Sequence, residues 1–448
     1  MFSQTGIQEI RETIKRAVEN QEIPGANLLI LKDGNEQLYC EEGYANLEEK
    51  KKIQRDTIFR LYSMTKPVTA AAVMMLVERG WVDLAQPVAE LIPGFADQKV
   101  CQSDGTLVPA ARPSTVRDLM NMTAGLVYLG DETAAERETT KVYENIIERM
   151  YGEHPVTTTE MANQIGRCPL RYQPGEIWQY SSGADVLGAV VEAVTGVTFG
   201  EFLREEFFGP LEMPDTDFYV PQEKQDRLIV PYMWDAEKKL IPYKGCNLAI
   251  MNDMAVPNAF ESGGAGLAST IDDYAHFAGM LMAKGVYKGK RLMGERTVEF
   301  LTTGVLTPGQ RRGMDSWLAL EGHTYGNLMR VLTEPGRAMA MGSLGEYGWD
   351  GWEGCYFANC PKEGLTILLM TAVHASHLSP AAFWLLASFD FGKWWCGFLM
   401  LSYIRTVFPL SIFRILSSAV TQTSSADGLY RSFWSQDTTS WSRACMYR

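Results

Sequence analysis

The stretch Leu61-Tyr-Ser63-Met-Thr-Lys66-Pro67 decides how the rest of this sequence is interpreted. Ser63 and Lys66 are three residues apart, so on a helix they lie on one face, one turn from each other. A neutral lysine within hydrogen-bond reach can take the proton of a serine hydroxyl if burial lowers the lysine pKa. The stretch therefore predicts a nucleophilic Ser63. The same spacing is also typical of a serine cap followed by a solvated lysine, so the interpretation depends on the other motifs.

A second segment, Gln173-Pro-Gly-Glu-Ile-Trp-Gln-Tyr180-Ser-Ser182-Gly, contains a turn, a short extended piece and the start of a helix. Tyr180 is expected just before that helix, where the positive end of the helix dipole favours a phenolate. The alternative is a packing tyrosine followed by a serine cap. Tyr180 is thus a second candidate for moving protons.

A third segment, Gly345-Glu-Tyr-Gly348-Trp349-Asp350-Gly351-Trp352-Glu-Gly354, repeats glycine every third residue. Glycines in a strand let the backbone come close to a ligand or to another segment. A tight turn with an exposed aromatic residue would produce the same pattern. The segment is therefore a candidate wall of a binding site.

Together these segments resemble the serine β-lactamase and D-alanyl-peptidase superfamily, and most closely class C β-lactamases and the family VIII carboxylesterases. Four further stretches agree in order and spacing, and the resemblance extends from about residue 5 to residue 373. They are Gly80-Trp-Val-Asp-Leu84, Thr115-Val-Arg-Asp-Leu-Met-Asn-Met-Thr-Ala-Gly125, Gly263-Gly-Ala-Gly-Leu-Ala-Ser-Thr270 and Tyr325-Gly326. The resemblance implies an α/β (α+β) fold of the β-lactamase/D-Ala-peptidase type. That fold has an antiparallel sheet flanked by helices, an inserted all-helical lobe, and the nucleophile between them.

The resemblance also assigns roles to residues. Ser63 would be the acylated nucleophile, and Lys66 its proton acceptor or the group that keeps Tyr180 ionised. Tyr180 would be the base for acylation and for activating water, and would return the proton to the leaving group. The backbone N–H groups of Ser63 and Trp352 would form the oxyanion hole.

Two departures from the family pattern affect the expected substrate. The second motif often ends in asparagine, where this chain has Ser182, and the third often begins with lysine, where it has Trp349. That lysine pairs with the carboxylate of β-lactams and D-Ala peptides. Trp349 would leave an apolar wall, and Asp350, followed by Gly351, would further disfavour anionic substrates. Ser182, Trp349, Asp350 and Gly351 are the predicted substrate-binding residues, and the expected substrates are neutral.

Periodicity predicts strands towards both ends of the recognisable chain and helices between them. We expect one catalytic domain over 1–374, with a sheet lobe at about 1–66 and 291–374 and a mainly helical lobe at about 67–290. The expected helices are 7–18, 59–79, 115–122, 182–195, 199–208 and 269–281, and the expected strands are 26–32, 37–40, 328–332, 354–358 and 365–373.

Composition excludes several classes of function. The chain has 448 residues and a net charge of −13, without a run of lysine and arginine, so nucleic acid is not an expected partner and a membrane is an improbable one. Residues 1–21 have no apolar signal-peptide core, which predicts a cytoplasmic location. Residues 375–448 contain no glutamate and five of the 11 tryptophans. We interpret them as an atypical, non-native or poorly ordered tail.

The sequence therefore predicts a serine hydrolase that acts on small acyl esters or amides. The alternatives are a β-lactamase or D-alanyl-D-alanine carboxypeptidase, a transacylase, and a non-catalytic sensor of acyl ligands. A Ser-His-Asp hydrolase is disfavoured because the chain lacks the G-x-S-x-G elbow. No cofactor or metal is expected, because Cys355 and Cys360 have no matching cluster of ligands. The oligomeric state stays open.

Overall fold

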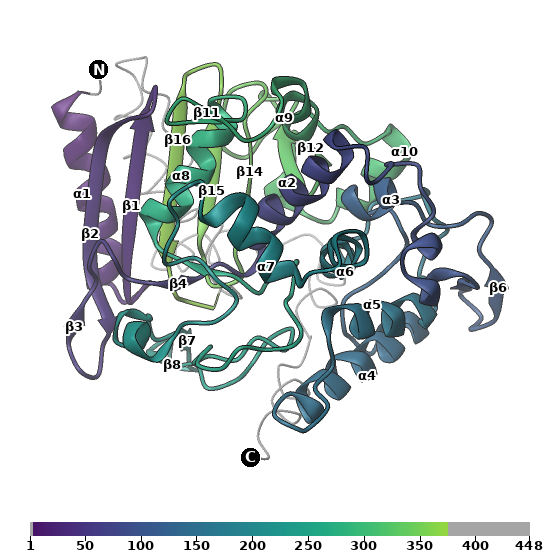
Figure 1. The fold of residues 1–448 in the computed structure, drawn as a ribbon. Coiled ribbons are helices and arrows are strands. Elements are labelled where there is room, and N and C mark those ends of the chain that lie inside the picture. Colours follow the sequence, from purple (N-terminus) through teal and green to yellow (C-terminus); the bar gives the residue numbers. More distant parts are fainter. Residues whose placement is uncertain (1–2, 375–448) are drawn as a thin grey trace, which may run out of the picture.

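The computed structural model describes residues 3–374 (Figure 1). The prediction of an atypical tail over 375–448 lies outside these residues. At the centre is an eight-stranded antiparallel sheet in the order β12-β13-β14-β15-β16-β1-β2-β3. Its strands are β1 Gly25–Lys32, β2 Asn35–Asn46, β3 Lys51–Lys52, β12 His323–Gly326, β13 Met329–Leu332, β14 Tyr347–Asp350, β15 Tyr356–Cys360 and β16 Leu365–Thr371.

The two ends of the described chain meet in the middle of this sheet. Strand β1 pairs with β2 on one side and with β16 on the other, and Leu29 lies opposite Leu368. The hairpin from β1 to β2 turns at Asp33 and Gly34, both of which have positive φ, a conformation typical of an Asp-Gly turn between two strands. The predicted antiparallel sheet fold is confirmed, and the sheet joins segments more than 300 residues apart.

Helix α1 (Gln4–Glu19) covers one face of the sheet (Figure 1). Ser3 caps its first turn, and Ile10 and Ile14 point inward at helical spacing. They pack on alternate residues of the central strands, among them Leu28, Ile30 and Ile367. Because the outer face of α1 is charged, burial of this apolar stripe fixes which face of the helix packs on the sheet.

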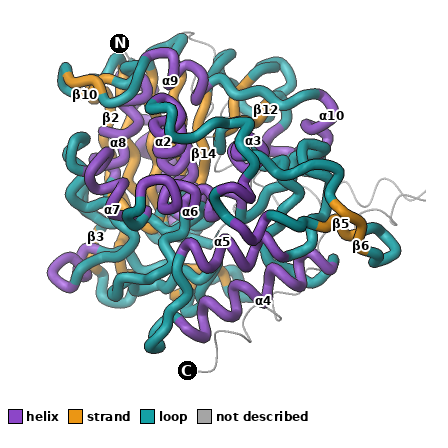
Figure 2. The backbone as a smooth tube through the Cα atoms, turned by 45° about the vertical axis from the view of Figure 1, so that its right-hand side comes forward, coloured by secondary structure: helices purple, strands orange, loops and turns teal. Residues whose placement is uncertain are grey.

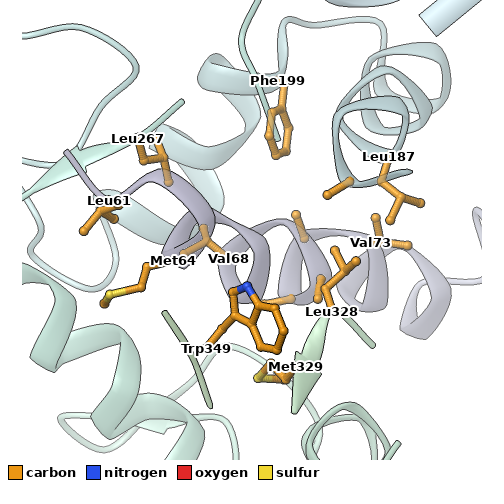
Figure 3. Close-up of a cluster of buried hydrophobic side chains, with 14 of the residues drawn as sticks. Leu61, Met64, Val68, Val73, Leu187, Phe199, Leu267, Leu328, Met329 and Trp349 are labelled. Atoms are coloured by element: carbon orange, nitrogen blue, oxygen red, sulfur yellow. The ribbon is translucent and has the colours of Figure 1, made fainter. Parts of the chain in front are cut away.

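Helices α2 (Thr65–Glu78), α8 (Ile271–Met282) and α9 (Glu295–Thr302) lie on the other side. Helix α8 contacts β15, β16 and β1, while α2 contacts β14 and α9. Figure 3 shows α2 surrounded by apolar side chains, including Met329 and Trp349 from the sheet and Leu187 from α6. Helix α2 is thus buried nearly all round, which explains its uniformly apolar sequence.

The remaining helices gather beside the sheet, with α4 and α5 farthest from it (Figure 2). Helix α6 contacts α2, α3, α5 and α7 and so links this region to the centre. The elements are α3 Val116–Met120, α4 Ala134–Arg149, α5 Thr158–Arg167, α6 Gly183–Thr195, α7 Phe199–Leu203 and α10 Pro308–Arg311, with short pairs β5 Lys99–Cys101 and β6 Leu107–Pro109, β7 Tyr232–Trp234 and β8 Leu240–Pro242, and β10 Val286–Tyr287 and β11 Lys290–Arg291.

The segment before the nucleophile differs from the predicted helix over 59–79. Residues Phe59–Arg60 form strand β4, which pairs with β9 (Ala268–Ser269), and a 3-10 turn over Tyr62–Met64 leads into α2. Tyr62 has a φ of 43°. A non-glycine residue in that conformation is strained, and strain of this kind persists where surrounding contacts over-determine it.

No single helix within residues 3–374 has the length and apolar composition of a membrane span. Helix α6 together with Phe199–Phe208 reaches both criteria only as a pair bent by 81°.

Candidate active site

Ser63, Lys66 and Tyr180 converge although Tyr180 is more than 100 residues away in sequence. The Lys66 Nζ lies 3.0 Å from the Ser63 Oγ, and the Tyr180 Oη lies 2.7 Å from the same oxygen. Ser63 sits in the turn at the start of α2 and is partly exposed, whereas Lys66 is buried in the first turn of the helix. The hydroxyl of Ser63 therefore faces two proton-handling groups, on a residue that is itself partly exposed.

Burial sets the protonation of Lys66. It lowers the lysine pKa to about 7, against the opposing charges of Asp185 and Asp350. Nζ also donates to the Gly264 carbonyl at 2.8 Å and reaches the Tyr128 Oη at 3.2 Å. A lysine in this environment can be neutral at ordinary pH and can accept a proton.

Tyr180 precedes α6 as predicted, but burial opposes the ionisation that the helix end would favour. Burial raises the pKa of Tyr180, and its hydrogen bonds with Ser63 and Trp349 oppose that rise only in part. The Trp349 Nε1 donates to the Tyr180 Oη at 3.1 Å. Burial therefore favours the phenol form of Tyr180, which can donate to Ser63, over the expected phenolate.

The third motif approaches the nucleophile through its backbone. A Cβ on Gly351 would lie 2.4 Å from the Leu61 carbonyl oxygen, so only glycine allows the end of β14 to come this close. The ring of the next residue, Trp352, packs 5.0 Å from Tyr62, which directly precedes Ser63. Residues 351–352 thus lie against the Ser63 turn, where the N–H of Trp352 was predicted to act.

The predicted substrate-binding side chains differ in their burial and in the groups that they contact. Trp349 is buried at 3% exposure and serves Tyr180 instead of forming an open wall. Ser182 is fully buried, and its hydroxyl donates to the Val127 carbonyl. Asp350 is half-exposed and pairs at 3.2 Å with the buried guanidinium of Arg330, which offsets part of its charge.

Two aromatic residues near the site were missed by sequence reasoning. Tyr128 contacts Lys66 and packs 5.6 Å from Tyr180, and it lies in an irregular segment without a motif. Trp317 places its ring 5.2 Å from that of Tyr180 and is 39% exposed. It therefore forms part of the surface around the reacting groups.

Chemically, this arrangement can generate a serine nucleophile. Lys66 can accept the proton of the Ser63 hydroxyl, and the protonated Tyr180 can deliver a proton to a group that leaves from the same place.

No cluster of three or more metal-ligating side chains occurs within residues 3–374.

Comparison with known proteins places this geometry in a family. The model of the Beta-lactamase family matches residues 10–388. An uncharacterized protein of Mycobacterium tuberculosis is 32% identical over 351 residues, which are 76% of this chain and 83% of that protein. Esterase EstB of Burkholderia gladioli is 28% identical over 80% of this chain and 88% of its own. Among solved structures, EstCE1, described as a hydrolase with promiscuous acyltransferase activity, has a TM-score of 0.70 at 23% identity and covers 85% of this chain and 96% of its own.

Proposed function

Because this chain belongs to the beta-lactamase family of serine hydrolases, we propose that it cleaves small neutral acyl esters through an acyl-enzyme on Ser63. One observation carries the proposal. The Ser63 Oγ is within 3.0 Å of both a buried lysine and a tyrosine whose pKa is raised by burial. A serine held in this way has a proton acceptor and a proton donor at once.

In the acylation step, the Ser63 Oγ attacks the ester carbonyl carbon and its proton passes to the neutral Lys66 Nζ. The carbonyl oxygen gains negative charge, which the N–H groups of Ser63 and Trp352 would stabilise. The carbon–oxygen bond to the alcohol then breaks, and Tyr180 protonates the leaving oxygen. The Lys66 ammonium returns a proton to the tyrosinate, so both groups regain their starting states.

In the deacylation step, water attacks the carbonyl carbon of the acyl-enzyme and loses a proton to the neutral Lys66. The bond from the acyl carbon to the Ser63 Oγ breaks, and that oxygen takes the proton back. The sum of both steps is ester plus water giving acid plus alcohol. How Lys66 and Tyr180 share the proton is a property of the coupled pair.

The substrate class follows from which charges surround Ser63. Trp349 stands at the position where relatives with a carboxylate anchor have a cation, and its indole is engaged with Tyr180. Lys66 is held by the serine and by the Gly264 carbonyl. A β-lactam carboxylate therefore lacks an anchor here, whereas a neutral ester needs none. The similarity to Esterase EstB supports the same choice.

Intact-protein mass spectrometry tests the proposal. After incubation with 4-nitrophenyl acetate, the wild-type protein should gain a transient acetyl group on Ser63, and Ser63→Ala should gain none and turn over no ester. Benzylpenicillin and a cephalosporin should acylate slowly. Efficient penicillin turnover without esterase activity would favour the β-lactamase or peptidase alternative, and a stable adduct without turnover would favour the acyl-ligand sensor.

A second candidate function is transfer of the acyl group to an alcohol. The half-exposed ring of Trp317 beside Tyr180 offers an apolar surface on which an acceptor alcohol could rest. EstCE1, whose fold is similar, is described as a hydrolase with promiscuous acyltransferase activity. Adding benzyl alcohol to the 4-nitrophenyl acetate reaction should then yield benzyl acetate, and acetate as the sole product would exclude this activity.

A further inference from the structure

A tight turn over Ser262–Ala265 forms hydrogen bonds with two helices. One is α2, which carries Lys66, and the other is α6, which follows Tyr180. On the α2 side, the Gly264 carbonyl accepts from the Lys66 Nζ at 2.8 Å, and the Gly263 carbonyl accepts from the Thr69 hydroxyl at 2.6 Å. The position of this turn therefore sets where the lysine amine is held.

On the α6 side, the turn is held by one carboxylate. Asp185, 1% exposed in the first turn of α6, accepts a hydrogen bond from the Gly264 N–H at 2.9 Å. It also accepts from the Ser262 hydroxyl, and the Tyr143 hydroxyl lies 3.3 Å from it. The Gly264 carbonyl thus accepts a hydrogen bond from Lys66, and the Gly264 N–H donates one to Asp185.

The glycines of this turn are required by the close fit. A Cβ on Gly263 would lie 2.4 Å from the Ala184 carbonyl oxygen, and a Cβ on Gly264 would lie 2.9 Å from both Asp185 oxygens. This explains the Gly263-Gly264 pair of the sequence, which no role in the reaction had accounted for.

We propose that Asp185 is a positioning residue for Lys66: it fixes the Gly264 carbonyl against the lysine amine and keeps a buried negative charge beside it. For catalysis the inference rests on the proposed function, in which Lys66 takes the Ser63 proton. Asp185 itself touches neither Ser63 nor the substrate side of the site.

Burial raises the pKa of Asp185, while the hydrogen bonds it accepts and the charge of Lys66 favour its carboxylate form. In that form Asp185 acts on Lys66 in a defined direction. Burial lowers the lysine pKa, and the carboxylates of Asp185 and Asp350 oppose that effect. Tyr128 and Tyr180 also face the amine. Removal of the Asp185 charge should therefore lower the Lys66 pKa further, because only Asp350 would still favour the ammonium form.

Lysine labelled with ¹³C at Cε permits a direct test by NMR, with Lys66→Arg identifying the signal. In the wild-type protein the Lys66 signal should titrate near pH 7. In Asp185→Asn the amide oxygen can still accept from Gly264 and Ser262, so the turn is kept. The midpoint should move down by roughly half a pH unit or more. An unchanged midpoint would overturn the proposal.

Asp273→Asn is the matched control. Asp273 is buried in the first turn of α8 and accepts from the Asp215 N–H and the Thr216 hydroxyl, but it is not among the charges that act on Lys66. Its variant should share any loss of stability and leave the Lys66 midpoint unchanged. A shift as large as that of Asp185→Asn would also overturn the proposal.

Gly264→Ala covers the case in which Asp185→Asn does not fold. It keeps the charge but pushes the turn away from Asp185, so Ser63 should react with a fluorophosphonate at least severalfold more slowly. A rate within twofold of the wild-type rate would count against the proposal. If Ser63 takes no label in the wild-type protein, the proposed function fails, while the Lys66 titration still decides the role of Asp185.

Discussion

Lys66 and Tyr180 share one oxygen, the Ser63 Oγ, and so cannot act independently. Lys66→Ala and Tyr180→Phe should each lower kcat/KM for 4-nitrophenyl acetate by about 10²–10⁴-fold, and the double variant should lose little more. The reason is that either change interrupts the same proton path. Steady-state kinetics of the three variants measures this directly.

Tyr128→Phe is a suitable control for that experiment, since Tyr128 contacts Lys66 and no bond joins it to Ser63. We expect a loss below about tenfold for this variant. Losses that multiply in the Lys66 and Tyr180 double variant would instead indicate two separate roles.

The pH dependence of acylation should follow Lys66. The lysine must be neutral to take the Ser63 proton, and its pKa lies near 7 because of burial. The value of kcat/KM should therefore fall as pH drops through about 7 and level off above about 8. The profile for a neutral ester between pH 5 and 9 measures it, and an acid limb near pH 4–5 would point to a carboxylate base.

At the scale of residues, the sequence identified Ser63, Lys66 and Tyr180 but not what surrounds them. The motifs record which reactive groups are present. The hydrogen bonds of Lys66 to Tyr128 and Gly264 depend on segments that pack only in the folded chain. The effect of burial on the pKa of Tyr180 is hidden for the same reason, because burial cannot be judged from its place before a helix.

At the scale of elements, the close fit between the end of β14 and the turn before α2 is the most sensitive contact. Gly351→Ala should clash with the Leu61 carbonyl and displace residues 351–352 from Ser63. We expect kcat for 4-nitrophenyl acetate to drop by about 10²-fold or more, the magnitude typical of a damaged oxyanion hole. Circular dichroism should show that the protein still folds.

Gly279→Ala in α8 is the matched glycine control. Apart from its chain neighbours and the nearby backbone of its own helix, no atom lies within 4 Å of the added Cβ, so this variant should keep its activity. It should also be more stable by about 0.5–1 kcal/mol, since alanine is the better helix former. Equal activity of the two variants would show that the approach of residues 351–352 does not matter for the reaction.

Elements with a strong local pattern were predicted well, and those defined by pairing were not. Helix α1 carries clear periodicity and strand β1 is a short apolar run, and their predicted bounds lie close to the observed ones. Residues 59–60 were assigned to a helix because they join an apolar run. They form a strand because β9, about 200 residues later, supplies its partner. Such partners are visible only in three dimensions.

At the scale of the whole molecule, the sheet is built from both ends of residues 3–374, with β1 and β16 side by side. The resemblance implied such a sheet, but its strand order could not be read from periodicity. Helix α8 lies within the predicted helical lobe of 67–290 and packs on β15 and β16. The predicted boundaries therefore divide the sequence. That they also divide the structure into a sheet lobe and a helical lobe stays a prediction.

The net charge of −13 belongs to the molecule as a whole and should influence which esters reach Ser63. An anionic ester, such as a 4-nitrophenyl hemisuccinate, is repelled at low salt, where the Debye length is about 20–30 Å. Raising sodium chloride from about 10 to 200 mM should increase its kcat/KM by roughly 2–10-fold, because screening removes the repulsion. The value for neutral 4-nitrophenyl acetate should stay within about twofold over the same range, which makes it the internal control.

A decrease for the anionic ester would instead reveal a local cation that attracts its carboxylate. The absence of an anchor, inferred from Trp349, would then be wrong, and anionic β-lactams would become plausible substrates again.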